Sequence, residues 1–330
     1  MPIVREDIGY QAMDEWEPLI KGAFPGFALM GRLHRGWSSD VKYRLYSEDH
    51  GFCLIRLSRS VALNKRQETA RMMEIAISAG LSSPLPLACG TLPGGITYIL
   101  QTWLEGTPLD DVLSTLGAGE QYALGRRAGK MLAGLHNARV SYDAPDFGLR
   151  TVRRIKRKLE AYSKSADLVP RAVEALEFIR DNLGLLRDRP SLPQHGDFHP
   201  GNMLINGHGN ISLIDFDRCG YGDPYEEFYK AQFFARPLSE HFINGQIHSY
   251  FDDCVPASFW PLFKLYLAEA VFYSPVWALP FGSDQVRHLS ELSKTAADDF
   301  GSFTFDLPVW YISSKEYQAA RQLMPMPATD

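Results

Sequence analysis

At 330 residues the chain can bury a sizeable core, and it exceeds the usual size of one compact domain, about 100–150 residues. With 45% hydrophobic and 22% charged residues, its composition is that of an ordinary globular protein and excludes a disordered or fibrous chain. The formal charge of −5 provides no basic surface of the kind that nucleic acids bind, although it is compatible with a cationic substrate. We therefore expect two lobes and no nucleic-acid partner.

The four cysteines and the N-terminus bear on the cellular compartment. Cys53, Cys89, Cys219 and Cys254 form no C-x-x-C pair, so free thiols are expected instead of a zinc site or a disulfide framework. Charged residues near the start exclude an ordinary signal peptide, and the apolar runs are too short to span a bilayer. A cytoplasmic protein without a membrane partner is expected. The oligomeric state is not indicated.

The first third of the chain predicts a small sheet flanked by helices. Residues 6–21 predict an opening helix, and residues 27–33, 41–46 and 52–57 predict three strands because β-branched, aromatic and aliphatic residues are bounded there by turn residues. A helix is predicted from Leu63 to Ala79, where Gly80 suits its C-cap. The segment 84–86 breaks that helix, and residues 96–102 predict one more strand that leads into a linker.

Beyond residue 109 the pattern is helical. Apolar residues recur at helical spacing in the segment that ends at His136, which favours lobe core over a ligand pocket. Residues 150–163 and 171–186 predict further helices, and the basic first one is interpreted as solvated surface. An aromatic group around Trp277 favours core packing over a substrate wall. The tail from Pro308 is expected to have no regular role in the core.

The strongest functional pattern is His195–Asn202, with sequence H-G-D-F-H-P-G-N, followed by I-D-F-D at Ile214–Asp217. Transfer of a phosphoryl group to a hydroxyl needs a carboxylate that receives the hydroxyl proton, and Asp197 fits this role. It also needs a hard cation held by a few oxygen ligands, for which Asn202 and Asp215 are suitable. The five-residue step from Asp197 to Asn202 is that of the kinase catalytic loop. Plain turn chemistry is the alternative, but it does not require the whole series.

The pattern H-G-D-x-H-P-G-N-x-L…I-D-F-D, with Gly222-Asp223-Pro224 shortly after, resembles the aminoglycoside phosphotransferase and choline kinase superfamily. The resemblance implies an α+β, protein-kinase-like fold of two lobes. The N-lobe, residues 1–103, would hold an antiparallel sheet and a helix, and the C-lobe, residues 104–330, would be mostly helical. ATP would lie in the cleft. Mg²⁺ would bind Asn202 and Asp215, whereas Asp217 is equally consistent with a second Mg²⁺ contact and with a loop-stabilising charge.

The same resemblance implies a set of nucleotide-binding residues. The loop over the phosphates contains Gly36 alone among the expected glycines, so backbone N–H groups and the hydroxyls of Ser38 and Ser39 would make its contacts, and a plain hairpin is the alternative. Arg56 stands where the family has a lysine, with Glu68 as its expected partner. The main-chain groups that hold adenine would be those of two linker residues, Thr102 and Leu104.

These observations predict a phosphotransferase that moves the γ-phosphoryl group of ATP to a hydroxyl of a small molecule, such as an aminoglycoside or macrolide antibiotic, an amino alcohol or a sugar. The short passage from Asp217 to Asp223 leaves no room for the activation segment of protein kinases. A protein kinase and a nucleotide-binding pseudokinase are the alternatives, the second because of Arg56. Glu226 and Glu227 suit either a helix start or contacts with substrate amines. The histidines of the loop are expected to be structural.

Overall fold

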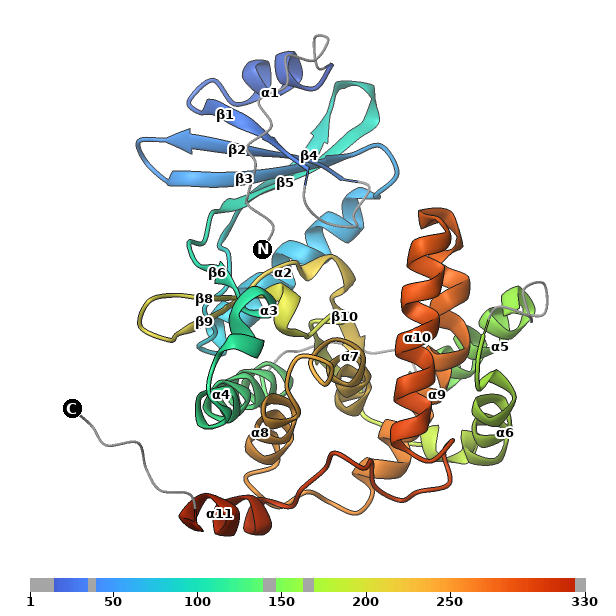
Figure 1. Cartoon of the computed structure of the whole chain (residues 1–330). Helices are drawn as coiled ribbons and strands as arrows, with labels where there is room; N and C mark the ends of the chain where they lie inside the picture. Colours follow the sequence, from blue (N-terminus) through green and yellow to red (C-terminus); the bar gives the residue numbers. More distant parts are fainter. Residues whose placement is uncertain (1–14, 35–39, 139–146, 163–168, 324–330) are drawn as a thin grey trace. The chain divides into compact units, whose positions relative to one another are not determined.

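We analysed a computed structural model, which describes residues 15–34, 40–138, 147–162 and 169–323. The chain divides into two compact units (Figure 1). The first contains Met1–Glu74 and Pro84–Leu104, and the second contains Ile75–Ser83 and Glu105–Asp330. The helix α2 (Leu63–Ser78) therefore contributes residues to both units.

The first unit is built on a five-stranded antiparallel sheet in the order β1-β2-β3-β5-β4. The three strands predicted before residue 60 and the strand predicted after residue 95 are all present. The strand β4 was not predicted, because the segment that contains it was interpreted only as a helix break. The strands are β1 (Ala28–Leu33), β2 (Val41–Ser47), β3 (Gly51–Ser58), β4 (Pro86–Leu92) and β5 (Ile96–Thr102).

One face of this sheet packs on α1 (Glu17–Ala23), whereas α2 lies on the other side (Figure 1). Side chains alternate between the faces of a strand, and Tyr43, Leu45 and Ile55 all point to the α1 side, where they are fully buried with Ile20. The opening helix was predicted over residues 6–21; the described helix α1 begins at Glu17 and ends at Ala23, and residues 6–14 lie outside the described residues.

The helix α2 ends as the sequence predicted. Gly80 has φ +83°, a left-handed conformation that favours glycine, and its N–H donates to the Ile77 carbonyl. The Leu81 N–H then reaches back to the carbonyl of Ala76 at 3.0 Å. These bonds satisfy carbonyls of the last turn and release the chain toward β4.

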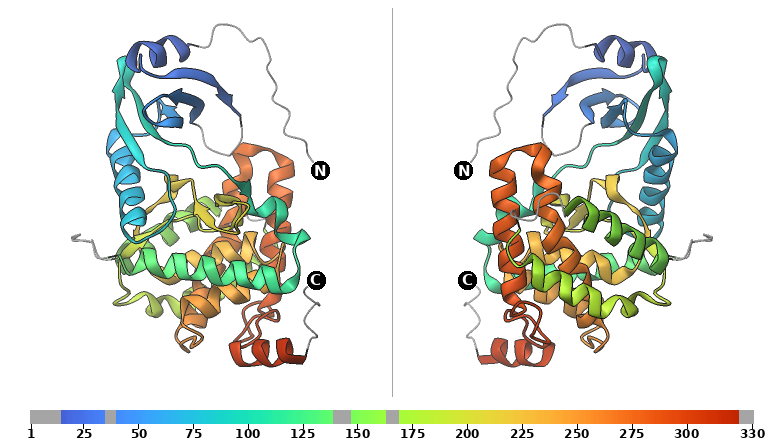
Figure 2. Two further views of the ribbon diagram at one scale, coloured as in Figure 1. Left: turned by 90° about the vertical axis from the view of Figure 1, so that its left-hand side faces the viewer. Right: turned by 90° about the vertical axis from the view of Figure 1, so that its right-hand side faces the viewer.

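The second unit is mostly helical, with two small sheets on either side of the loop that carries the motif (Figures 1 and 2). β10 (Gly220–Gly222) pairs with β7 (Leu192–Gln194), and β8 (Met203–Ile205) pairs with both β6 (Thr107–Pro108) and β9 (Ile211–Leu213). The helices are α3 (Leu109–Val112), α4 (Ala118–His136), α5 (Phe147–Tyr162), α6 (Ala172–Asn182), α7 (Phe228–Phe234), α8 (Glu240–Tyr250), α9 (Phe259–Ala278), α10 (Ser283–Asp299) and α11 (Ser314–Leu323).

The helices α4 and α8 lie side by side in unusually close contact (Figure 1). A Cβ atom added at Gly125 would collide with the carbonyl of Phe242, and one added at Gly129 would collide with that of Gln246. The contact is reciprocal, since Gly245 of α8 meets the carbonyl of Tyr122. Only glycine permits backbones to approach this closely, so these positions fix the spacing of the helix pair.

The C-terminal segment is part of the core, contrary to the prediction for the tail from Pro308. Trp310 is buried, and its indole N–H donates to Gln232 Oε1 at 2.9 Å. Asn244 of α8 donates to the Trp310 carbonyl, and Tyr317 of α11 stacks on Tyr122 with ring centroids 3.9 Å apart. The prediction was wrong because these partners lie more than 60 residues earlier in the chain. Residues 324–330 lie outside the described residues.

The mixture of an antiparallel sheet with a helical second unit confirms the predicted α+β class. Among the helices that the structure describes, none combines the length and the apolar character needed to cross a membrane.

Candidate active site

The motif forms a loop between β7 and β8 that is anchored at its first residues. Gly196 has φ +78°, and a Cβ atom there would collide with the carbonyl of Arg218. Its N–H donates to Glu227 Oε1 at 2.8 Å, which ties the loop to the turn before α7. The second residue of H-G-D is therefore a glycine for both conformation and space.

His195 braces this loop against the segment that carries Asp215. Its Nε2 donates to the carbonyl of Ile214 at 2.9 Å, and its Nδ1 accepts the N–H of Asp197 at 3.3 Å. One ring nitrogen thus donates while the other accepts, which requires the neutral Nε2–H tautomer. Burial of the ring lowers the pKa of His195 and favours the same form. The predicted structural role of this histidine is consistent with these contacts.

The backbone brings the two predicted metal ligands of this unit together. The N–H of Ile214 donates to the carbonyl of Asn202 at 2.9 Å, so Asp215 follows directly from a residue that is bonded to the loop. Asp215 has φ +62°, a left-handed conformation that is unusual for a residue with a side chain. Backbone strain of this kind is found preferentially at functional sites.

Asn202 is oriented by the loop. Its Nδ2 donates to the carbonyl of Asp197 at 2.9 Å and to Asp197 Oδ2 at 3.2 Å. Because both bonds to Asp197 use the amide nitrogen, Oδ1 is the atom that can serve as an oxygen ligand. His199 supports the turn in a similar way, since its Nδ1 accepts the N–H of Gly201 and its ring packs on Phe234.

Asp197 lies beside three nitrogen-bearing side chains from different segments. Lys230 Nζ of α7 is 2.7 Å from Oδ1, and Arg218 Nε is 3.7 Å from Oδ2. His199 Nε2 is 3.8 Å from the same Oδ2. Burial alone would raise the pKa of Asp197, but the ammonium of Lys230, together with the other two groups, holds it well below its usual range. The carboxylate is therefore ionised and able to accept a hydroxyl proton.

Sequence reasoning missed Lys230, which lies 33 positions beyond Asp197. A signal was present, because Lys230 is the single charged residue of the aromatic helix Phe228–Phe234. A lysine within an apolar helical turn is buried only with a partner, so this pattern predicts a carboxylate close by. The pattern does not say which carboxylate it is.

The glutamates that precede α7 are both engaged by the protein. Glu226 accepts from Arg154 Nη2 at 2.7 Å, and Glu269 of α9 accepts from both Arg154 and Lys158. Glu227 is buried and holds the N–H of Gly196. Glu226 and Glu227 therefore make contacts within the protein, instead of the contacts with substrate amines that were one interpretation of the sequence. The basic face of α5, interpreted as solvated surface, supplies the arginine and lysine of this network.

In the first unit, the predicted phosphate-binding cation belongs to a buried ion cluster. Arg56 Nε is 3.0 Å from Asp40 Oδ2, and Arg66 of α2 donates to both oxygens of Asp40 at 2.8 and 2.9 Å. The acidic partner of Arg56 is thus Asp40. Glu68, the partner expected from the sequence, instead contacts Lys65 one turn earlier on α2. The reason is burial, since the Glu68 side chain is 41% exposed whereas that of Arg56 is 4% exposed.

The linker residues differ in what their backbones can offer. The N–H of Thr102 donates to the carbonyl of Leu85, and the N–H of Trp103 donates to that of Phe52. The sheet therefore uses one of the two main-chain groups of Thr102, a residue that was expected to contact adenine through its main chain. Leu104 lies beyond these ladder bonds. Ser38 and Ser39 lie outside the described residues.

Comparisons with known proteins bear directly on this site. The model of one protein family, described as a phosphotransferase enzyme family, matches residues 31–260. The chain belongs to this family. The match includes Arg56 and the complete loop His195–Asn202, and it confirms the resemblance that the motif indicated. No curated protein matches the sequence at a significant level.

Solved structures of similar fold are aminoglycoside phosphotransferases. A thermostable variant of APH(4)-Ia in ternary complex with ADP and hygromycin B has a TM-score of 0.65 and 17% identity, and covers 86% of this chain and 97% of its own. The GDP complex of aminoglycoside 2′-phosphotransferase-IIIa has a TM-score of 0.61, 12% identity and coverages of 86% and 97%. ADP-bound APH(2″)-Ib has a TM-score of 0.59, 14% identity and coverages of 85% and 98%. At these identities the likeness establishes the fold.

The residues of this phosphotransferase fit a hard cation better than a transition metal. Within the described residues, no three His, Cys, Asp or Glu side chains converge as a metal-binding group. A site made from the Oδ1 atom of Asn202 and the carboxylate of Asp215 has few protein ligands, which is the arrangement in which Mg²⁺ keeps water and phosphate oxygens in its shell. Asp217 lies two residues further, in the short helix Phe216–Arg218, and is half-buried.

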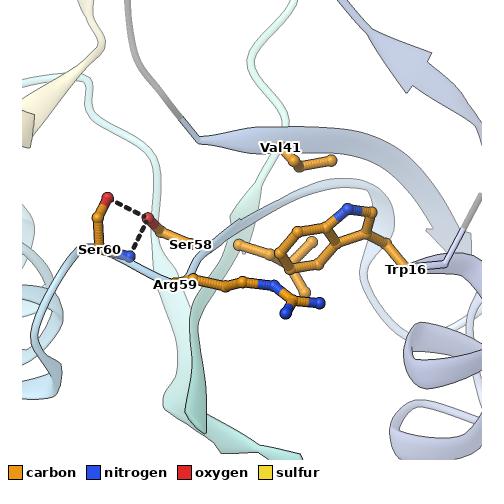
Figure 3. A pocket seen from close by; sticks show the side chains of 6 residues that line it. Trp16, Val41, Ser58, Arg59 and Ser60 are labelled. Carbon is orange, nitrogen blue, oxygen red and sulfur yellow. Dashed lines mark hydrogen bonds between the residues drawn. The ribbon is translucent and has the colours of Figure 1, made fainter. Parts of the chain in front are cut away.

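A separate hollow of about 330 Å³ lies in the first unit (Figure 3). The guanidinium of Arg59 lies over the ring of Trp16 and is paired with Glu15 at 3.0 Å. Ser58 Oγ accepts the N–H groups of Ser60 and Val61 at the approach to α2. The polar groups around the hollow therefore bond to other groups of the protein. We interpret the hollow as part of the packing between α1 and the sheet.

Proposed function

We propose that this protein transfers the γ-phosphoryl group of ATP to a hydroxyl group of a small molecule. The observation that carries the proposal is the arrangement around Asp197. The ionised Asp197 accepts bonds from the side-chain amide of Asn202, and the Asn202 carbonyl in turn accepts the N–H of Ile214, the residue before Asp215. Phosphoryl transfer requires little more of a protein than this positioning and charge stabilisation.

Asp197 acts as the acceptor of the hydroxyl proton. As the acceptor oxygen forms its bond to the γ-phosphorus, the bond from that phosphorus to the β,γ-bridging oxygen breaks, and ADP leaves with the electron pair. The proton of the hydroxyl passes to Asp197 Oδ2, the oxygen whose contacts with Asn202, Arg218 and His199 are all 3.2 Å or longer. His195 takes no proton, because its ring nitrogens are occupied by the loop backbone.

Asn202 and Asp215 would hold the Mg²⁺ ion, and we include Asp217 as a further candidate ligand. A bound Mg²⁺ neutralises phosphate charge and orients the phosphates for in-line transfer. In the first unit, Arg56 is our candidate for the phosphate contact, since a guanidinium can bind phosphate oxygens while Asp40 fixes its Nε. Leu104 is our candidate for the main-chain contact with the base.

The charges near Asp197 bear on the class of acceptor. Glu226 and Glu269 are neutralised by Arg154 and Lys158, and Asp197 already has Lys230 as its partner. The exposed Arg218 adds a positive charge, held over the ring of Trp277 at 5.2 Å. We therefore favour a hydroxyl compound with little or no positive charge, such as a macrolide with its single amine or a sugar derivative, over a polycationic aminoglycoside.

The test is a panel of acceptors incubated with radiolabelled ATP and, in parallel, GTP. Aminoglycosides, macrolides, amino alcohols, sugars and hydroxy acids are compared, with Asp197→Asn as the inactive control. Transfer of label to a small molecule that depends on Asp197 supports the proposal. Label on protein substrates only, with no small acceptor labelled, would contradict it.

A nucleotide-binding protein without transfer activity is the second candidate, and one observation favours it. Arg56 replaces the usual lysine and shares Asp40 with a second arginine. Such a protein would bind ATP with micromolar or tighter affinity in calorimetry, yet release no label to any acceptor or to water. Slow hydrolysis of ATP that disappears in Asp197→Ala would exclude this candidate.

A further inference from the structure

Lys230 is a buried lysine whose position is explained by a single carboxylate. Its side chain is 9% exposed, and its Nζ lies 2.7 Å from Asp197 Oδ1. The rings of Tyr229 and Phe234 lie 5.2 and 5.5 Å from the same nitrogen. No other carboxylate is within ion-pair distance of Lys230 in the part of the chain that the structure describes. Taking an ammonium out of water is expensive, and aromatic faces repay only part of that cost.

The two oxygens of Asp197 are treated differently by their surroundings. Oδ1 receives the short contact from Lys230, whereas Oδ2 has an amide donor at 3.2 Å, a guanidinium nitrogen at 3.7 Å and an imidazole nitrogen at 3.8 Å. A carboxylate held at one oxygen by a charge-assisted contact has little rotational freedom at the other. The plane of the carboxylate is thus set from the α7 side.

We propose that Lys230 is a positioning residue for Asp197, holding Oδ1 so that Oδ2 is presented to the acceptor hydroxyl. The inference rests on the proposed phosphotransfer function. Lys230 itself need not touch the acceptor or the nucleotide. Its effect reaches the reaction through the orientation of Asp197, and misorientation of a catalytic group by about 1 Å can lower a rate by about 100-fold.

A purely structural role explains the contact between Lys230 and Asp197 less well. The turn before α7 is already joined to the loop by Glu227, which accepts the Gly196 N–H at 2.8 Å. A second buried lysine of this unit shows what a structural contact looks like: Lys264 of α9 donates to a neutral backbone carbonyl, that of Phe305, at 3.0 Å. Its ammonium also lies 5.1 Å from an aromatic ring, that of Phe178. Lys264 therefore provides a matched control.

The experiment compares the full-length wild type with Lys230→Met, Lys230→Arg and Lys264→Met. The substrate is ATP with the best acceptor of the panel or, without one, water in the slow hydrolysis of radiolabelled ATP. For Lys230→Met we expect kcat to fall by about 100-fold while the KM of each substrate changes by less than about threefold. Lys230→Arg keeps the charge and should recover a large part of the loss. Lys264→Met should retain the wild-type kcat per folded molecule.

The folded fraction is measured for each variant by thermal unfolding, so that loss of structure is separated from loss of orientation. A kcat of Lys230→Met within about threefold of the wild type would overturn the role of Lys230. So would a loss shared equally by Lys264→Met that follows the folded fraction. Failure of the proposed function is distinct, because it appears in the wild type itself as turnover that Asp197→Asn does not remove, and it would overturn the role of Lys230 with it.

Discussion

Asp40 in the first unit and Asp197 in the second are both carboxylates surrounded by cations, yet their surroundings differ. The Asp40 side chain is 1% exposed, and its oxygens receive three guanidinium contacts between 2.8 and 3.0 Å. The Asp197 side chain is 20% exposed, with one short ionic contact at Oδ1 and longer ones at Oδ2. Asp40 is saturated, whereas Asp197 keeps an oxygen that a substrate can reach.

This difference separates a carboxylate that stabilises structure from one that is prepared for chemistry. Removing one partner of a fully paired buried carboxylate lowers the free energy of unfolding strongly, because the remaining charges are then left uncompensated. An ionised carboxylate with one accessible oxygen can take a proton there while its other oxygen keeps the contact with the ammonium as a hydrogen bond. The comparison can be tested by exchanging each carboxylate for its amide.

The largest effect is expected for Asp197→Asn. The amide cannot accept the hydroxyl proton, so kcat should fall by about 1,000-fold or more while the affinity for ATP is retained. Rates of transfer and calorimetric titration with ATP measure the two quantities. A variant that keeps a tenth of the wild-type kcat would show that Asp197 is not the proton acceptor.

Asp40→Asn should act on stability instead. It leaves two buried guanidinium groups without their carboxylate, for which a loss of about 3–5 kcal/mol in the free energy of unfolding is expected. Urea unfolding of this variant is compared with that of Glu48→Gln, an exposed glutamate in the turn at the other end of β2. Equal unfolding midpoints for the two variants would contradict the assignment of Asp40 as a structural carboxylate.

The pH dependence of the free energy of unfolding should reveal the titration of Glu227. Burial raises the pKa of Glu227 from 4.5 to about 7, so the folded protein holds a proton that the unfolded chain releases earlier. The stabilisation is present below pH 4.5 and is lost as pH rises through 7, with an amplitude of about 3 kcal/mol. Glu227→Gln removes this titration, so the stability of the wild type relative to the variant should fall between pH 4.5 and 7.5. Parallel pH profiles from urea unfolding would show that the group does not titrate in this range.

The smallest effect is expected for Glu68→Gln. Its ion pair with Lys65 is partly exposed and links residues three positions apart on α2, an arrangement worth about 0.2–0.5 kcal/mol. The affinity for ATP should stay within about twofold if Asp40, not Glu68, fixes Arg56. A tenfold loss of ATP affinity, measured by calorimetry, would restore Glu68 to the role that the sequence suggested.

Elements defined by local patterns could be predicted from the sequence. The strands β2 and β3 follow from their aliphatic and aromatic runs, and α4 from its apolar spacing. The pair β7–β10 could not, because three-residue strands carry no recognisable alternation and are formed by partners 26 to 30 residues away. The strand β4 was not predicted because Pro84 precedes it and Pro86 is its first residue, which favoured a break over a strand.

The loop His195–Asn202 could be proposed as catalytic from the sequence because the residues suited to that chemistry lie within eight positions. The charges that support it could not, since they come from distant segments. Asp40 and Arg66 are 26 positions apart, and the residue expected to pair with Arg56 was chosen by family pattern and not by burial. The sequence shows that Lys230 lies among aromatic residues, which is unusual for a lysine. Only the structure identifies Asp197 as its partner.

The contacts of the C-terminal segment determine when the second unit can complete its packing during synthesis. Trp310 fills the core beside Gln232 and Asn244, and Tyr317 completes the stack on Tyr122 of α4. These contacts cannot form until the chain has been synthesised as far as Tyr317. A nascent chain that already contains the loop His195–Asn202 therefore still lacks part of the core beneath it. The second unit can reach its final packing only after Tyr317 has left the ribosome.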